Sequence, residues 1–226
     1  MKVWVYVEGE SDRIALNALW TKWKTALGQA GWGVQLIPLD DKYRFFRKIG
    51  PHATEKLLAD HLDLVVGLPD FYPNQPFVGT PCKHATVNDL VNLQRKLVQD
   101  TITRKSLDAV SLMQRFHSSS LTHDLEMLLL AACDQLRAHL GTSERLGCWR
   151  HPVEDQNQNQ PPKRIVETLY LEKKRRRYRD TKDAAAVLGM VTDFRQILHS
   201  GSGQLQCPVF KSMLDWIGMK TGVPAY

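Results

Sequence analysis

Three short apolar runs in the first third of the chain predict buried strands. In residues 3–7, valines alternate with a tryptophan and a tyrosine, so that both faces of the run carry β-branched or aromatic side chains. This pattern is typical of a central strand in an α/β sheet, which is covered on both faces. Residues 34–39 and 62–68 form two further apolar runs, which are less regular.

The segments between these runs have helical spacing. Apolar residues recur every three or four positions from residue 13 to residue 29, and Ser11 is predicted to cap this helix. Two helical pieces are expected over residues 43–49 and 54–59. Strands that alternate with helices favour an α/β fold with a mostly parallel central sheet and flanking helices, and ligands bind such sheets beyond the carboxyl ends of the strands.

The remainder of the chain is predicted to be mainly helical. An amphipathic helix is expected over residues 86–102, and residues 109–116 are interpreted as a further strand. A helix is predicted to open at Thr122 and to stop at Gly141. The polar segment 154–162 is interpreted as a surface loop, and short helices are expected over residues 164–171, 184–190, 191–198 and 210–217. We expect one domain, residues 1–226, with a helical C-terminal extension from about residue 150.

Composition adds a class of protein to this outline. The chain has 226 residues, of which 43% are hydrophobic and 24% are charged, and this is typical of a globular protein. It lacks both a run of ~20 apolar residues and the pattern of an export signal, so a cytoplasmic protein without a membrane partner is predicted. The cysteines are scattered and are expected to be reduced and mostly buried: Cys82, Cys133, Cys148 and Cys207.

Acidic residues follow two of the predicted strands. Glu8 ends the first strand and is followed by Gly9, where the backbone can turn sharply, and Asp70 ends the third strand in a Pro-Asp-Phe-Tyr-Pro turn. If these strands are neighbours, the two carboxylates converge and suit a hard divalent cation. The alternative is structural: Glu8 interacts with the dipole of the next helix, and Asp70 belongs to an Asx-turn.

A histidine and a glutamate lie at the start of the helix expected from Thr122. His123 and Glu126 are three residues apart, which predicts that they share one helix face. They could serve as a general base and a metal ligand, or as a polar cap that is satisfied within the protein.

Basic residues are concentrated in one segment. The net charge is 30 − 24 = +6, and residues 173–179 contain six cations around Tyr178. A solvated helix face is the usual interpretation of a charge run, but repulsion within this one favours an anionic partner. Nucleic-acid contacts are expected from Lys163, Arg164, Lys173, Lys174, Arg175, Arg176, Arg177, Arg179 and Lys182. The chain has no phosphate-binding glycine motif, so any ATPase would have to be a partner protein.

Several motifs together resemble a known family. A hydrophobic strand that ends in Val7-Glu8-Gly9-Glu10-Ser11-Asp12 and enters a helix resembles the Toprim domain, which is shared by primases, topoisomerases and OLD-type nucleases. The order of the later motifs is similar to that in Toprim-like prokaryotic proteins that are often encoded beside ATPases in phage-defence settings. These motifs are Val65-Val66-Gly67-Leu68-Pro69-Asp70-Phe71-Tyr72, His123-Asp124-Leu125-Glu126-Met127-Leu128-Leu129, Lys163-Arg164, Tyr178-Arg179-Asp180-Thr181-Lys182 and Cys207-Pro208-Val209-Phe210.

The resemblance implies a function and a cofactor. It implies that Glu8 and Asp70 bind Mg²⁺ or Mn²⁺ for the cleavage of nucleic-acid phosphodiesters, in an anti-phage effector with an ATPase partner. This chain departs from the Toprim pattern, because the usual Asp-x-Asp of the third strand is replaced by Asp70-Phe71-Tyr72. Two-metal hydrolysis would then need a carboxylate from Glu126 or Asp12. The alternative function is a catalytically reduced module or adaptor that binds nucleic acid or protein.

Overall fold

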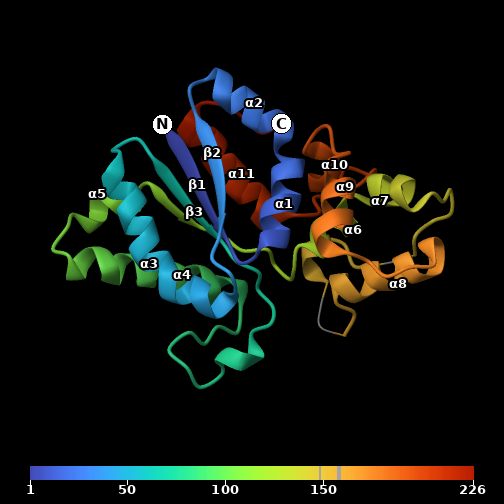
Figure 1. Cartoon of the computed structure of the whole chain (residues 1–226), viewed down its shortest axis with the longest axis horizontal. Helices are drawn as coiled ribbons and strands as arrows, with labels where there is room; N and C mark the ends of the chain where they lie inside the picture. Colours follow the sequence, from blue (N-terminus) through green and yellow to red (C-terminus); the bar gives the residue numbers. More distant parts are fainter. Residues whose placement is uncertain (148, 157–158) are drawn as a thin grey trace.

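A parallel sheet forms the centre of the molecule. The computed structural model describes residues 1–147, 149–156 and 159–226. Within these ranges it contains one four-stranded sheet, in which every neighbouring pair of strands is parallel and the order is β2-β1-β3-β4 (Figure 1). The strands are β1 (Lys2–Val7), β2 (Gly33–Pro38), β3 (Leu64–Leu68) and β4 (Phe116–Ser118). The predicted α/β class is confirmed, and this sheet is wholly rather than mostly parallel.

Helices cover both faces of this sheet. The α-helices are α1 (Glu10–Leu19), α2 (Thr21–Gln29), α3 (Lys42–Ala59), α4 (Val87–Arg104), α5 (Ala109–Met113), α6 (Glu126–Ala131), α7 (Cys133–Leu140), α8 (Pro162–Lys174), α9 (Ala185–Leu188), α10 (Arg195–Leu198) and α11 (Pro208–Thr221). Single turns of 3₁₀-helix lie at Gln75–Phe77 and Val153–Asp155, and a π-helix lies at Asp180–Ala184. In Figure 1, α3, α4 and α5 lie on one side of the sheet, and α1 and the C-terminal helices lie on the other.

The alternation in β1 explains these two layers. The side chains of Val3, Val5 and Val7 are fully buried in one apolar cluster, which also contains residues of α1, α2 and the C-terminal helices. Tyr6 points the other way and is buried with residues of α3 and α4. A strand that is covered on both faces is held firmly, so its carboxyl end is a rigid place for a functional side chain.

The first helices differ from their predicted bounds. Gly9, rather than Ser11, is the N-cap of α1, and its backbone N–H donates a hydrogen bond to Asp12 at 2.9 Å. The helix expected over residues 13–29 is divided at the buried Trp20. The two pieces expected around residue 50 form one helix, α3, which continues through Pro51 because it packs closely along α4.

Two later predictions are wrong. Residues 109–113 form α5, which is capped by Asp108, and of the strand expected over residues 109–116 only the final residue belongs to the short strand β4. The helix expected from Thr122 begins at Glu126, since the preceding residues extend alongside the end of β3, where Tyr72 N–H donates to the carbonyl oxygen of His123. Gly141 ends α7 in a left-handed conformation, as predicted.

The polar segment 154–162 is not wholly a surface loop. Val153 and Glu154 are buried, and the carboxylate of Glu154 accepts hydrogen bonds from the backbone N–H groups of Val209 and Phe210 at the start of α11. Asn157 and Gln158 lie outside the described residues. The single domain and the extension from about residue 150 remain predictions.

The cysteines and the membrane prediction can be compared with the described part of the chain. Cys82, Cys133 and Cys207 have free thiols, as expected, but only Cys207 is fully buried, and Cys148 lies outside the described residues. No helix in those residues combines the length and the apolar character that a membrane crossing requires.

Candidate functional site

Two acidic residues meet at the carboxyl edge of the sheet. Strands β1 and β3 are parallel neighbours with Val7 opposite Leu68, so the residues that follow each strand lie at the same edge. Glu8 and Asp70 therefore converge, and the backbone N–H of Asp70 is near enough to the Glu8 carboxyl to lower its pKa slightly. The sequence-based expectation for this pair depended on the strand order, which the structure supplies.

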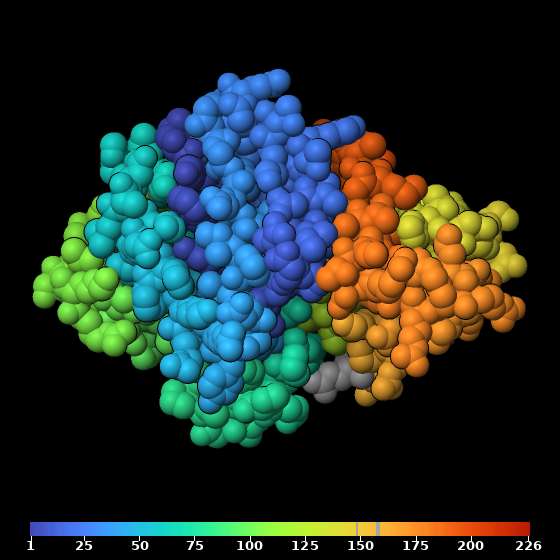
Figure 2. Space-filling view, in the orientation of Figure 1, coloured from blue at the N-terminus to red at the C-terminus, as the bar shows by residue number. Residues whose placement is uncertain are grey.

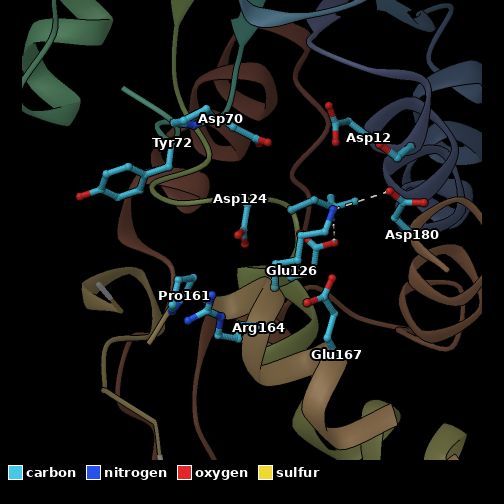
Figure 3. Close-up of a pocket in the computed structure, with 13 residues that line it drawn as sticks. Asp12, Asp70, Tyr72, Asp124, Glu126, Pro161, Arg164, Glu167 and Asp180 are labelled. Atoms are coloured by element: carbon cyan, nitrogen blue, oxygen red, sulfur yellow. Dashed lines mark ion pairs between the residues drawn. The ribbon is translucent and has the colours of Figure 1, made fainter. Parts of the chain in front are cut away.

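A cavity of about 440 Å³ opens in front of Asp70. In the space-filling view, the N-terminal segment lies directly against the segment that follows residue 160 (Figure 2), and both segments contribute residues to the lining of the cavity. The charged residues that line it are Asp12, Asp70, Asp124, Glu126, Glu167, Asp180, Lys163 and Arg164, and Figure 3 shows several of the carboxylates turned toward a shared central space. The cavity thus collects acids from segments that are far apart in the sequence.

Burial and mutual repulsion perturb these carboxyls. Burial, with smaller contributions from the charges of Asp180 and Asp124, raises the pKa of Asp12 to about 6, although the Gly9 N–H and the charge of Lys163 oppose this shift. Burial likewise raises the pKa of Glu126 to about 7, with a smaller contribution from Asp124. Burial raises the pKa of Asp70 well above its usual range, and the charges of Asp12 and Glu8 add to this effect. Such clustered acids are costly to keep ionised without a cation.

Glu8 lies behind the cavity rather than on its wall. Burial raises its pKa to about 7, an effect that the positive charge of Lys42 partly offsets. The Nζ atom of Lys42 lies 3.4 Å from Glu8 Oε1 and donates a hydrogen bond to the carbonyl oxygen of Pro73 at 3.1 Å. Lys42 was not a sequence candidate, because a lysine in the first turn of an amphipathic helix is ordinarily exposed.

The free carboxylate oxygens of this site are the type of ligand that an oxygen-binding cation prefers. Glu8 Oε1, Asp70 Oδ1 and Asp124 Oδ1 are buried and make no hydrogen bond to the described residues. Among those residues, no three His, Cys, Asp or Glu side chains are already arranged to hold a metal ion. Mg²⁺ commonly keeps several waters and uses only one or two carboxylates, so such a set of three is not required for it. The carboxylate oxygens that line the cavity therefore fit Mg²⁺ or Mn²⁺.

His123 is not brought into the cavity. It precedes α6 and so does not share a helix face with Glu126, contrary to the prediction. Its Nδ1 atom lies 3.2 Å from Asp124 Oδ2, and its ring packs against Tyr72 with the ring centroids 4.4 Å apart. These contacts assign His123 to the wall behind Asp124.

Four further acids of the cavity were missed as candidates or left in reserve. Asp12 was considered only as a replacement for the missing third-strand acid, and Asp124 and Asp180 lie within motifs of the family resemblance without having been singled out. Glu167 lies in the helix expected over residues 164–171 and was not a candidate. Their position beside Glu126 and Lys163 depends on how α6 and α8 pack, which the sequence does not reveal.

Two basic candidates lie in the cavity. Lys163 and Arg164 begin α8 and line its wall, and Lys163 Nζ lies 3.7 Å from Asp180 and 4.0 Å from Glu126 (Figure 3). The 13 residues of α8 span about 20 Å, at a rise of about 1.5 Å per residue. The basic run 173–179 therefore begins at the far end of α8 from the cavity (Figure 1).

The cations of this run are not equally available. Arg176 donates two hydrogen bonds of 2.7 Å to the buried carboxylate of Asp183 and lies over the ring of Tyr170. Lys173 forms an ion pair with Glu144. The exposed cations of the run are Lys174, Arg175, Arg177 and Arg179, and Lys182 is exposed just beyond it.

Comparisons with known proteins give one distant likeness. No family model matches the chain, and no curated protein matches it. Among solved structures, it is similar to the C-terminal region of the OLD protein of Xanthomonas campestris pv. campestris phased with mercury, with 15% identity and a TM-score of 0.45 over 98% of this chain and 96% of the other. The same region phased with platinum gives 16% identity and a TM-score of 0.37 over 84% and 83% of the two chains.

Proposed function

We propose that this chain is a metal-dependent nuclease that hydrolyses nucleic-acid phosphodiesters. The observation that carries the proposal is the gathering of Asp12, Asp70, Asp124 and Glu126 around one cavity, with Lys163 on its wall. An array of carboxylates beside a basic side chain suits a divalent cation together with a phosphate group. Asp70, Asp12 and Glu126 would hold the cation, while Glu8 adds negative charge beside Asp70 at the same edge of the sheet.

The cation and the basic side chains would have different roles in binding the phosphates of the substrate. When bound, Mg²⁺ supplies positive charge to the phosphate and lowers the pKa of a coordinated water. Lys163 and Arg164 would contact the phosphate at the cleavage position, because they lie on the cavity wall. The exposed cations Lys174, Arg175, Arg177 and Arg179 would bind neighbouring phosphates along the strand.

Substitution of the cavity acids tests this function. Asp70→Asn and Asp12→Asn should each lower the rate of Mg²⁺-dependent cleavage of DNA or RNA at least ~100-fold, since each removes part of an interaction worth several kcal/mol in the transition state. Asp100→Asn is a matched control, because Asp100 is an exposed residue of α4 that pairs only with Lys96 among the described residues. Cleavage at the wild-type rate by both cavity variants, or cleavage that persists in EDTA, would contradict the proposal.

The biological setting belongs to the same proposal. The resemblance of the sequence motifs to Toprim-like proteins encoded beside ATPases supports an effector of prokaryotic anti-phage defence with an ATPase partner. Since the chain has no phosphate-binding glycine motif, ATP would be hydrolysed by that partner. Purification of the tagged chain from its own host should recover an ATPase, and recovery of the chain without one would count against the partner.

A second function is favoured by two observations. Tyr72 supplies an aromatic ring where a Toprim third strand has an acid, and among the described residues no three candidate ligands are already arranged to hold a metal ion. Both features suit a catalytically reduced module that only binds nucleic acid or protein. Calorimetry separates the two functions: this module would bind no Mg²⁺ or Mn²⁺, yet its affinity for nucleic acid would still fall steeply with salt.

A further inference from the structure

One lysine is buried among the carboxylates of the candidate site. The side chain of Lys42 is only 5% exposed, whereas that of Lys48 on the same helix is 41% exposed and pairs with Asp40 at the surface. Lys42 Nζ donates to the carbonyl oxygen of Pro73 and lies 3.4 Å from Glu8 Oε1. A buried ammonium is costly unless it is paired, so its position opposite Glu8 needs a reason.

The topology of the sheet places Lys42 at this edge. Strand β2 is the parallel neighbour of β1 on the side opposite β3, with Pro38 opposite Val7. The chain then turns into α3, whose first residue is Lys42 and whose N-cap Asp41 accepts a hydrogen bond from Arg44 N–H. Lys42 therefore approaches Glu8 from the β2 side, while Asp70 approaches it from the β3 side.

The positive charges lie on two different sides of the acids. Lys42 lies against Glu8, its charge also acts on Asp70, and it does not line the cavity. Lys163 lines the cavity and lies near Glu126 and Asp180. Its charge stabilises ionised Asp12. The acids thus have a buried inner side, where a cation is built into the chain, and an open outer side, where the carboxylates line the cavity.

This arrangement limits how many metal ions the acids can accept. A divalent cation that bound Glu8 on the inner side would lie against the fixed ammonium, and at such short range two positive charges repel strongly in a buried environment. Among the described residues, the cations on the outer side are Lys163 and Arg164, which are both exposed at the cavity wall. Their long side chains can move into solvent.

We propose that Lys42 is a resident cation of the acidic site, which neutralises its inner side and restricts it to a single divalent ion on the cavity side. This proposal rests on the proposed function, because it assumes that the cavity takes up divalent cations.

The stoichiometry of Mn²⁺ binding tests the proposal. The full chain, Lys42→Gln and the control Lys48→Gln are stripped with EDTA, dialysed and titrated with MnCl₂ by calorimetry, with unfolding temperature as a second measurement. Glutamine keeps an N–H group for the Pro73 carbonyl and removes the charge. The wild type and Lys48→Gln should bind one ion each, Lys42→Gln should bind two, and Mn²⁺ should raise the unfolding temperature of Lys42→Gln more than that of the wild type.

Other results overturn one proposal or both. Two ions in the wild type, or one ion and an unchanged thermal shift in Lys42→Gln, would overturn the role of Lys42 and leave the nuclease proposal standing. If Lys42→Gln folds poorly, the wild-type stoichiometry decides: one ion supports the role, and two ions overturn it. No ion in the wild type would contradict both proposals, because the role of Lys42 assumes that the cavity takes up one divalent ion.

Discussion

Replacing Arg175 by glycine should make the protein more stable and lower its affinity for nucleic acid. Arg175 ends α8 with φ +55° and ψ +29°, a left-handed conformation that costs a non-glycine residue about 1–2 kcal/mol. Glycine removes this strain, but its greater conformational freedom in the unfolded chain lowers the free energy of unfolding by roughly 0.4–1 kcal/mol. The free energy of unfolding should therefore rise by about 0.5–1 kcal/mol in total. In a chain of this size, a gain of 1 kcal/mol raises the unfolding temperature by about 2–4 °C.

The same substitution removes one exposed cation from the basic run. If Arg175 contacts a phosphate, the slope of log affinity against log salt should become shallower by about 0.7–0.9, as expected for one lost contact. Thermal unfolding and fluorescence anisotropy with a labelled oligonucleotide at several salt concentrations measure both effects. Arg175→Lys keeps the charge and the strained backbone, so it should change neither by much. An Arg175→Gly protein with wild-type salt dependence would refute the assignment of this residue to nucleic-acid binding, and a lower unfolding temperature would refute the strain.

Two further predictions concern stability. Burial raises the pKa of Glu154 from 4.5 to about 7, so between these pH values the folded chain holds a proton that the unfolded chain has released, and the free energy of unfolding falls as the pH rises. Urea unfolding at pH 5 and pH 8 measures this change. The free energy of unfolding should fall less between the two pH values for Glu154→Gln than for the wild type, and equal declines in the two proteins would contradict this. A Cβ at Gly50 would lie 2.7 Å from the backbone oxygen of Leu97, so Gly50→Ala should destabilise the protein by about 1–3 kcal/mol. As a control, the Cβ of Gly28→Ala in α2 would meet nothing within 4 Å, so this substitution should stabilise the protein by about 1 kcal/mol. A stabilised Gly50→Ala protein would contradict the close packing of α3 on α4.

The sequence could predict the part of the site that depends on strand ends. The alternating run before Glu8 and the apolar run before Asp70 mark two buried strands from their own residues, and any acid that follows such a strand lies at the carboxyl edge. The pairing of β1 with β3 then brings the two acids together. Local pattern and fold agree here, so these candidates needed only the strand order.

The remaining residues depend on contacts that no local pattern records. Lys42 looks like an ordinary exposed residue at a helix start, and its burial follows from the pairing of β2 with β1 and from the position of the Pro73 carbonyl. Thr122 followed by Glu126 looks like a helix start, but Phe71 and Tyr72 N–H groups bond to the carbonyls of Leu121 and His123 and keep that segment extended. This pairing moves the start of α6 to Glu126 and removes His123 from the helix face.

A crystal structure after a soak in MnCl₂ would show whether the cavity acids hold a divalent cation, as phosphodiester cleavage by this site requires. Anomalous scattering at the manganese edge locates the ion without reference to any assay. We expect a single manganese peak in the cavity, in contact with Asp70 and at least one of Asp12 and Glu126, with Lys42 still bound to the Pro73 carbonyl. A cavity without a manganese peak at saturating concentration would show that these acids do not form a metal site.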